Sequence, residues 1–173
     1  RLNQKYYEGR CIALLKKCPE AVNYPMPPLM FTPFLRACWW GNTRMVDYML
    51  KHGADITSQT KDGDSPLYLA VYRATKTPRA FDPACINVLH NAGCDINMPK
   101  FHGYTPLHLA ARAGNTSLVR WLLAHGADPD SLSNGNKKPV DIANANGHRK
   151  VVSLLTVRTG EDYHRRRSQT RFK

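Results

Sequence analysis

Seven histidines and five cysteines are the side chains of this sequence with the most potential for metal binding or catalysis. The cysteines are Cys11, Cys18, Cys38, Cys85 and Cys94, and no C-x-x-C pair occurs among them. A zinc site needs closely spaced Cys and His ligands, which this pattern does not supply. The odd number of widely spaced cysteines favours reduced thiols, and therefore a cytoplasmic or nuclear location or both.

Catalytic signatures are also missing from the sequence. It contains no Gly-rich phosphate loop, no H-E-x-x-H and no G-x-S-x-G. His52 and His125 each precede a glycine, where a cation near a helix C-terminus is favoured by the helix dipole, so their expected role is structural. We therefore expect no catalytic residues, no metal site and no cofactor, and predict that the chain is not an enzyme.

The sequence is strongly basic, with 25 Lys and Arg against 13 Asp and Glu and a net charge of +12. More than half of this excess lies in residues 1–24 and 156–173. A positive excess favours acidic partners. The longest strictly apolar run, Leu67–Tyr72, has six residues. A membrane-spanning helix needs about 20, so the sequence predicts no membrane span.

A basic tail is expected at residues 158–173, and it contains Arg165, Arg166 and Arg167 followed by Ser168. Such a run attracts phosphates through counterion release, so it could serve nuclear import or nucleic-acid binding. The alternative is a solvated linker. Arg-Arg-Ser168 also resembles a site for basophilic kinases, which makes Ser168 a predicted phosphorylation site.

Two landmarks reveal an internal repeat. A Thr-Pro, Ser-Pro or Lys-Pro pair recurs at spacings of 33, 40 and 33 residues, beginning at Thr32, Ser65, Thr105 and Lys138. A glycine recurs at spacings of 40 and then 33 residues, at Gly53, Gly93 and Gly126. Because both landmarks share one period, the extra seven residues lie inside the second unit.

Each unit has the residues for two short helices. A Thr or Ser hydroxyl can cap the first helix, and proline suits its first position. Gly41, Gly114 and Gly147 end this helix in three of the units. The second helix shows apolar pairs at i and i+4, such as Leu118 with Leu122. Polar turns that contain glycine connect one unit to the next.

At these residues, and most clearly between Gly103 and Asp128, the sequence resembles the ankyrin-repeat family. The resemblance implies an all-α ankyrin-repeat solenoid over residues 1–157, with hairpin fingers between the helix pairs. Four recognisable repeats are expected at 27–57, 60–97, 100–130 and 133–157, after a degenerate N-terminal partial repeat at 2–24. The last repeat is expected to cap the solenoid. We also expect the chain to be part of a longer protein.

The resemblance indicates where a partner would bind, because finger tips and the ends of first helices usually carry the contacts in ankyrin repeats. The matching residues at helix ends are Trp39, Trp40, Tyr72, Arg73 and Arg112. The matching residues on a finger are Phe101, His102 and Tyr104. Trp, Tyr and Arg dominate binding hot spots because they bury a large area and also make polar contacts. Alternatively, one tryptophan of the pair points into the core.

Two segments depart from the repeat pattern. The seven-residue insertion, near 75–82, is either a tolerated surface loop or a contact loop that uses Arg79 and an exposed Phe81. The finger at 24–31 carries three prolines and several large apolar residues in place of a polar turn. It either packs on its own repeat or inserts into a partner as an exposed apolar finger.

These observations predict a non-catalytic protein-interaction module or scaffold. Its partner is expected to be another protein, which offers an acidic or phosphorylated segment or a partner domain to the concave face and the fingers. One alternative is a basic platform for nucleic acid or an anionic membrane surface. Another is the substrate-recognition part of a ubiquitin ligase. Asn97 matches a position that is hydroxylated in some ankyrin repeats, so it is a predicted modification site.

Overall fold

The computed structural model describes residues 2–76 and 81–156, with side chains described from Glu8 onward. The basic tail lies outside these ranges, as do five of the residues singled out above, among them the arginine of the contact loop proposed for the insertion. These residues are Arg79, Arg165, Arg166, Arg167 and Ser168.

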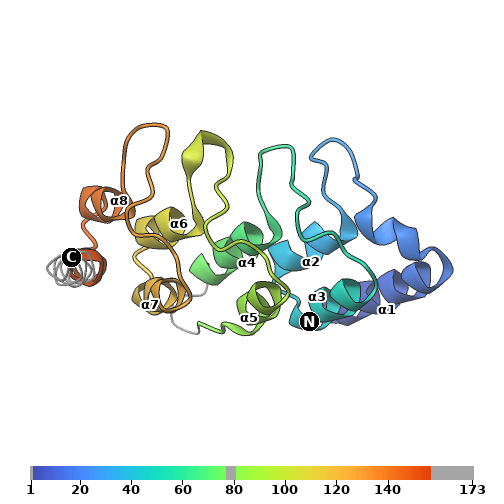
Figure 1. Ribbon diagram of the computed structural model, residues 1–173. Coiled ribbons are helices and arrows are strands. Elements are labelled where there is room, and N and C mark those ends of the chain that lie inside the picture. Colours follow the sequence, from blue (N-terminus) through green and yellow to red (C-terminus); the bar gives the residue numbers. More distant parts are fainter. Residues whose placement is uncertain (1, 77–80, 157–173) are drawn as a thin grey trace, which may run out of the picture.

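Pairs of short helices make up most of the described chain, as Figure 1 shows. The N-terminal segment forms α1 (Leu2–Lys17) and the 3-10 helix η1 (Pro19–Asn23). The pairs that follow are α2 (Pro33–Trp40) with α3 (Thr43–Lys51), α4 (Pro66–Thr75) with α5 (Ala84–Asn91), α6 (Pro106–Arg112) with α7 (Thr116–Ala124), and α8 (Pro139–Ala145) with the helical residues 149–156. A 3-10 turn, η2 (Phe101–Gly103), lies in the finger before α6. Within the described ranges no helix is both long and apolar enough to span a bilayer.

The expected caps start the first helix of the first three repeats. The hydroxyl oxygen of Thr32 accepts a hydrogen bond from the Leu35 amide at 3.1 Å, and that of Ser65 accepts one from the Tyr68 amide at 3.2 Å. Thr105 does the same in α6. These bonds satisfy amides that would otherwise lack a partner in the first turn, and each contributes about 1 kcal/mol.

Glycine ends three of the first helices because the chain adopts a left-handed conformation there, as it does at Gly147 after α8 with φ of 72°. Gly41 has φ of 65° after α2, and Gly114 has φ of 66° after α6. A side chain at such a position is strained. The second unit has Ala74 at the corresponding place, and α4 there runs on to Thr75 before the insertion.

The helices stack in two layers with the fingers projecting to one side (Figure 1). The inner layer contains α2, α4, α6 and α8, each packed on the next, while α3 and α5 pack together in the outer layer. The core between them holds large apolar side chains that are fully buried, including Phe34, Leu35, Leu67, Leu69, Leu107, Leu118 and Leu122. Burying each side chain of this size contributes roughly 1.5–3 kcal/mol. The predicted all-α solenoid is confirmed.

The N-terminal segment differs in form from the repeats that follow it. Gly9 lies inside α1, which continues as one helix of 16 residues where the repeats have two short ones. Leu15 and Val22 are nevertheless buried against the first repeat. The Glu8 carboxylate accepts a hydrogen bond from the Asn42 side chain at 2.7 Å, which joins α1 to the start of α3.

The described part of the insertion corrects one expectation. Phe81 is half-buried and packs on the hydrophobic core, so it is not the exposed contact residue that the sequence suggested. Asp82 then accepts a hydrogen bond from the Ala84 amide at 2.9 Å, as an N-terminal capping carboxylate does.

Backbone and side-chain hydrogen bonds link successive fingers. The Lys61 amide donates to the Leu29 carbonyl at 3.1 Å, and the Asn134 amide donates to the His102 carbonyl at 2.9 Å. Lys100 forms an ion pair with Asp64 of the preceding finger at 3.0 Å, and both side chains are largely buried. Each finger is therefore held in place by its neighbour.

Candidate partner-binding surface

A row of aromatic side chains crosses the first two repeats at the ends of the inner helices. Trp39 stacks on Tyr72 with ring centroids 4.8 Å apart and planes 22° apart. Phe31, which precedes α2, also meets Trp39, edge to face with ring centroids 5.9 Å apart. Both Trp39 and Tyr72 are half-buried against the core. The stack brings together two residues that the sequence placed in different repeats.

Trp40 has a different environment from Trp39. Its side chain is 58% exposed at the C-terminal end of α2. The aliphatic stem of Arg73 lies over the next residue, Gly41, because a Cβ built there would be 3.0 Å from the Arg73 Cγ. Trp40 and the exposed Arg73 therefore lie at adjoining positions of neighbouring repeats. Of the two tryptophans, Trp39 supports the surface and Trp40 faces solvent.

Arg112 continues this surface into the third repeat. It is exposed at the end of α6, and its positive charge opposes the rise in the pKa of Tyr68 on α4. Burial is the main cause of that rise and takes the pKa of Tyr68 to about 12. The Arg112 carbonyl also bonds to His148 Nε2 at 3.0 Å, which fixes the end of α6 against the last repeat.

Two further cations belong to this surface and were missed from the sequence. The Arg36 guanidinium lies 4.7 Å from the Phe31 ring centroid, and the Lys76 ammonium lies 4.8 Å from that of Tyr72. Both side chains are exposed. The signal for Arg36 was its place four residues before Trp40, which puts both on one face of a helix.

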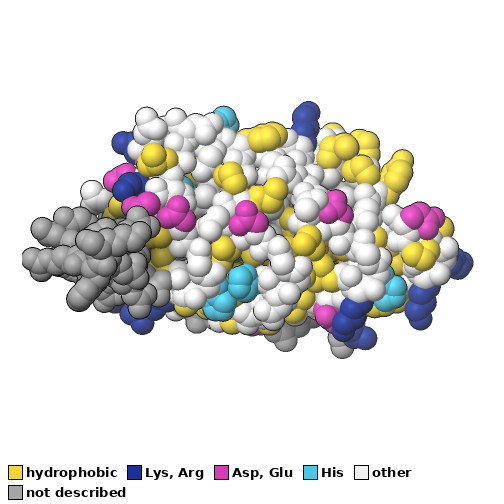
Figure 2. Space-filling view, viewed as in Figure 1, with side chains coloured by type: hydrophobic (Ala, Val, Ile, Leu, Met, Phe, Trp, Pro, Cys, Tyr) yellow, Lys and Arg dark blue, Asp and Glu magenta, His cyan; other side chains and the backbone are white. Residues whose placement is uncertain are grey.

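Charge is segregated within the solenoid. None of α2, α4 and α6 contains an acidic residue. Among the described residues, no ion pair forms at Arg36, Arg73 or Arg112. Acidic side chains recur instead in the loops after the outer helices, at Asp55, Asp95 and Asp128. Figure 2 shows acidic side chains in a row below the fingers. The inner helices thus present a surface of aromatic and cationic groups.

The predicted finger residues lie at the opposite end of the inner helices. Phe101 is 57% exposed at the finger tip, and the edge of its ring lies against Gly63 of the preceding finger. His102 is exposed and has φ of 71°. Tyr104 is half-buried, and its ring lies 5.4 Å from that of His108. A helix of seven residues separates this group from Arg112 by roughly 10 Å.

The apolar finger at 24–31 is exposed at its tip. Figure 2 shows hydrophobic side chains gathered there, at the upper right of the molecule. The exposed fractions are 70% for Tyr24, 45% for Met26, 49% for Leu29 and 40% for Met30. The bond from Lys61 to Leu29 holds this finger against the next one. An apolar patch of this kind on a rigid finger is typical of a contact surface.

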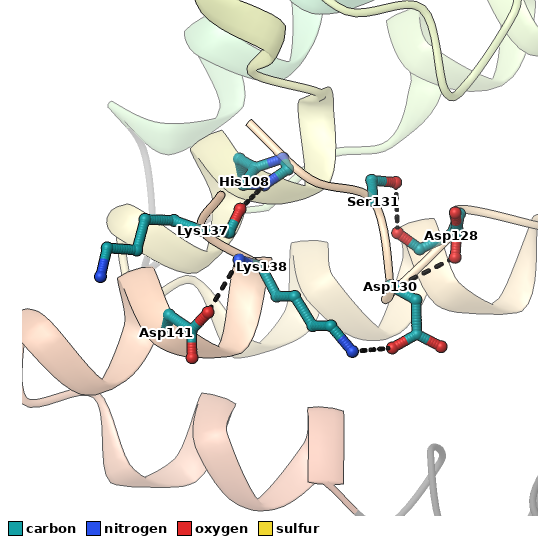
Figure 3. A network of polar contacts seen from close by, with 7 residues as sticks. All are labelled: His108, Asp128, Asp130, Ser131, Lys137, Lys138 and Asp141. Carbon is teal, nitrogen blue, oxygen red and sulfur yellow. Dashed lines mark hydrogen bonds and ion pairs between the residues drawn. The ribbon is translucent and has the colours of Figure 1, made fainter. Parts of the chain in front are cut away.

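A polar network joins the last two repeats, as Figure 3 shows. His108 is fully buried, and its Nε2 lies 2.9 Å from the Lys137 carbonyl oxygen. Lys138 replaces the usual capping Thr or Ser, and the Asp141 carboxylate instead accepts a hydrogen bond from the Lys138 amide at 2.8 Å. The Lys138 ammonium reaches Asp130 at 2.8 Å, and this hydrogen bond raises the pKa of Lys138.

Asn97 is engaged between two repeats. Its side-chain amide donates to the Gly126 carbonyl at 3.1 Å, and its side-chain oxygen accepts from the Asp128 amide at 2.8 Å. Asn23 makes the same pair of bonds to the next repeat, with Gly53 and Asp55. Asn97 therefore links repeats, and its hydroxylation stays a prediction.

The thiols lie mostly in the core. Cys38, Cys85 and Cys94 are buried and free. Burial raises the pKa of Cys85 to about 12 and that of Cys94 to about 11. These thiols are therefore protonated at neutral pH and poorly nucleophilic. In the part of the chain that the structure describes, no group of three or more His, Cys, Asp or Glu side chains is placed to hold a metal ion.

Family models identify the class of protein to which this architecture belongs. A model of ankyrin repeats in three copies matches residues 73–167, and a model of ankyrin repeats in many copies matches residues 34–77. The first match covers more than half of the 173 residues, so the chain belongs to the ankyrin-repeat family. Members of this family are generally non-catalytic modules for protein–protein interaction.

The chain is similar to several curated proteins, and their names describe different kinds of protein. Ankyrin repeat protein nuc-2 of Neurospora crassa is 33% identical over 133 residues, which is 76% of this chain and 12% of that protein. Putative E3 ubiquitin-protein ligase XBAT35 of Arabidopsis thaliana is 32% identical over 118 residues, 67% of this chain and 24% of that protein. Ankyrin repeat and SOCS box protein 11 of Danio rerio is 30% identical over 114 residues, 66% of this chain and 36% of that protein. The chain thus spans a minor part of each of these relatives.

Proposed function

We propose that this chain binds an acidic or phosphorylated segment, or a partner domain that carries one, through the inner helices and the fingers. The observation that carries the proposal is the exposed pair Trp40 and Arg73 on inner helices that contain no acidic residue. A tryptophan supplies a large contact area, and an exposed arginine supplies two parallel donors for a carboxylate or phosphate. Membership of a family of interaction modules supports the same role.

The apolar finger extends the proposed contact area. Tyr24, Met26, Leu29 and Met30 expose their side chains on a finger that the neighbouring finger holds in place. A partner domain could cover this tip while its acidic segment lies along the inner helices. A preorganised finger loses little conformational entropy on binding, which favours affinity.

Affinity capture tests this proposal. The immobilised chain is compared with the double variant Trp40→Ala/Arg73→Ala, and proteins captured from cell lysate are identified by mass spectrometry. A matched control, Arg44→Ala/Arg120→Ala, removes two exposed arginines from the outer helices. The first variant should lose partners that the wild-type chain and the control retain, with unchanged helical circular dichroism. Normal capture by Trp40→Ala/Arg73→Ala would overturn the proposal.

A basic platform for nucleic acid or an anionic membrane surface is the second candidate. The arginines at 165–167 favour it, because such a run binds phosphates electrostatically. Removal of residues 158–173 separates the two candidates. Phosphate-dominated binding should fall steeply with salt and disappear with the tail, whereas binding through Trp40 and Arg73 should persist.

A role in a ubiquitin ligase is a third candidate. One similar protein is named as a putative E3 ubiquitin-protein ligase and another as an ankyrin repeat and SOCS box protein. In such an assembly this solenoid would recognise the substrate. We also propose a cytoplasmic or nuclear location, which the free, buried thiols support. Co-purification of ligase subunits in the capture experiment tests this role.

A further inference from the structure

Each finger has a left-handed residue at the same place, two positions before the N-cap residue of the inner helix that follows. Gly63, Gly103 and Asn136 fill this place in three fingers, with φ of 75°, 72° and 52°. The apolar finger has Met30 there, with φ of 56°. Glycine and asparagine adopt this conformation readily, whereas methionine is strained in it. The side chain of Met30 is 40% exposed, so burial offsets only part of the strain. Strained residues of this kind cluster at binding sites.

A groove lies at the base of the apolar finger, where the finger meets η1 and the start of α2. Its volume is about 310 Å³, and it is lined by Glu20, Ala21, Tyr24, Met26 and Pro33. Clefts of roughly 300 Å³ and above hold small ligands, so this groove admits one bulky apolar side chain. Two of the exposed apolar residues of the finger, Tyr24 and Met26, therefore line a concave site.

The finger is held in a fixed shape at its base and at its tip. At the base the Met26 amide donates to the Phe31 carbonyl at 3.0 Å, and Phe31 is buried against Trp39. At the tip the Leu29 carbonyl accepts a hydrogen bond from the Lys61 amide of the next finger. A ligand therefore meets a preformed surface, and little conformational entropy is lost on binding.

The charge at the groove differs from that of the inner helices. Glu20 is exposed, and it is the one residue among those lining the groove that is charged at neutral pH. No described Lys, Arg or His forms an ion pair with it. Arg36 lies over the Phe31 ring and does not line the groove. A carboxylate beside apolar walls attracts a cation more strongly than in open water, because the local dielectric constant is lower. The groove therefore favours a cationic ligand, whereas the inner helices favour an anionic one.

We propose that the apolar finger and its groove bind a segment of another protein in which a bulky apolar residue stands next to a Lys or Arg. The apolar side chain enters the groove, and the adjacent cation pairs with Glu20. Leu29 and Met30 enlarge the apolar contact at the tip of the finger. This site goes beyond the proposed function, because it uses neither Trp40 nor Arg73 and prefers the opposite charge.

Peptide titrations of the complete, isotopically labelled chain test this proposal by NMR. The probe is acetyl-Ala-Ala-Phe-Arg-Ala-Ala-amide. One control peptide replaces Arg with Glu, and the other replaces Phe with Ser. The probe should shift amide signals within residues 20–31 and bind at least about fivefold more tightly than either control, because each control lacks one of the two contacts.

Variants of the protein assign each contact. Glu20→Gln should abolish the preference for Arg over Glu in the peptide, whereas Asp62→Asn, at an exposed position on the next finger, should retain it. Met26→Ala should weaken binding of the probe at least about fivefold. Leu132→Ala removes a similarly exposed apolar side chain from a later loop, and should leave the affinity unchanged.

Met30 provides a readout that separates binding from stability. Met30→Ala and Met30→Gly should both weaken binding of the probe, because both remove the apolar side chain. Only glycine relieves the left-handed strain, so Met30→Gly should melt about 2–4 °C above Met30→Ala. A purely structural role would change the melting temperature without changing the affinity, and would contradict the proposal.

Further outcomes overturn the proposal or assign the finger to another occupant. Equal affinities of the three peptides overturn it, as do a failure of the probe to bind and an unchanged preference in Glu20→Gln. Sedimentation of the chain, alone and with phosphatidylcholine vesicles, tests the other occupants. Self-association or vesicle binding that Met26→Ala abolishes would assign the finger to a second copy or to a lipid surface, and would also overturn the proposal.

The same titration separates this proposal from the proposed function. Trp40→Ala/Arg73→Ala should bind the probe as tightly as the wild type does. If the probe does not bind while partner capture depends on Trp40 and Arg73, this proposal fails and the proposed function stands. If the probe binds through Glu20 while capture does not depend on Trp40 and Arg73, the proposed function fails and this proposal stands.

Discussion

His108 shows how a side chain with catalytic potential serves structure in this protein. It is fully buried, with Nδ1 beside the Thr105 hydroxyl at 2.9 Å and Nε2 beside the Lys137 carbonyl at 2.9 Å. Both ring nitrogens thus have partners in the protein. Burial lowers the pKa of His108 from its usual 6.5, so the ring is neutral in the folded state. A buried, neutral histidine with two partners holds adjacent repeats together.

Replacing His108 should lower the stability of the fold. It should also make that stability less dependent on pH. The unfolded chain binds a proton near pH 6.5 that the folded ring resists, so stability falls as pH drops below that value. His108→Gln should lower the unfolding free energy at neutral pH by about 1–3 kcal/mol. It should also lose less stability than the wild type between about pH 7 and about pH 5. Urea unfolding at both pH values measures this.

The exposed His102 supplies the control for this prediction. His102→Gln removes a histidine from a finger tip without removing a buried bond, so its stability should fall with acidification as that of the wild type does. Identical losses on acidification in the wild type and in His108→Gln would contradict the assigned role of the buried ring.

The two tryptophans mark the limit of prediction at the residue scale. The sequence placed Trp39 and Trp40 at the end of a first helix, and the structure agrees. It could not decide which of two adjacent side chains faces solvent, because that depends on the rotation of α2 against α4. Nor could it find the stack of Trp39 on Tyr72, which requires the two repeats to lie side by side.

Gly114, at the end of α6, adopts a left-handed conformation and also leaves room for the His148 ring. A pair of substitutions can separate these two roles. Gly114 and Gly147 have similar φ values, 66° and 72°. A Cβ at Gly114 would lie 2.5 Å from the His148 ring, whereas the space at Gly147 is open. Gly147→Ala should cost about 1–2 kcal/mol from backbone strain alone. Gly114→Ala should cost more, because the displaced His148 ring also loses its bond to Arg112.

Thermal or urea unfolding of the two variants measures this difference. Equal destabilisation by Gly114→Ala and Gly147→Ala would show that the contact with His148 contributes nothing. The comparison is informative because both substitutions add the same methyl group to nearly the same backbone conformation.

Asn97 should contribute to the stability of the junction between repeats. Asn97→Ala removes bonds to Gly126 and Asp128, and should lower the unfolding free energy by about 1–2 kcal/mol. Asn91→Ala, at an exposed position at the end of α5, is the matched control and should have little effect. Urea unfolding measures both. A neutral effect of Asn97→Ala would contradict its structural role, and mass spectrometry of the protein from cells tests its hydroxylation.

At the element scale, local signals predicted the repeats well. Caps such as Thr32 and Ser65 and breakers such as Gly41 act within one turn of a helix, so their spacing fixes the helix starts and ends. The continuity of α1 through Gly9 and the burial of Phe81 depend on packing between distant segments. No local pattern in the sequence reports such packing.

Over the described residues the molecule is a solenoid in which three of the inner helices, α2, α4 and α6, contain no acidic residue. The repeat period predicted this architecture, because each helix pair must bury its apolar face against its neighbours. The net charge of +12 indicated an acidic partner without showing where it would bind. The structure places Arg36, Arg73 and Arg112 on these three helices.

The dissociation constant of a captured partner segment tests the central claim most directly. It is measured by calorimetry for the wild type, for Trp40→Ala/Arg73→Ala and for Arg44→Ala/Arg120→Ala. Loss of two central contacts should weaken binding at least about 100-fold, whereas the control should weaken it less than about threefold. Unchanged affinity in Trp40→Ala/Arg73→Ala, or an equal loss in both double variants, would contradict the account.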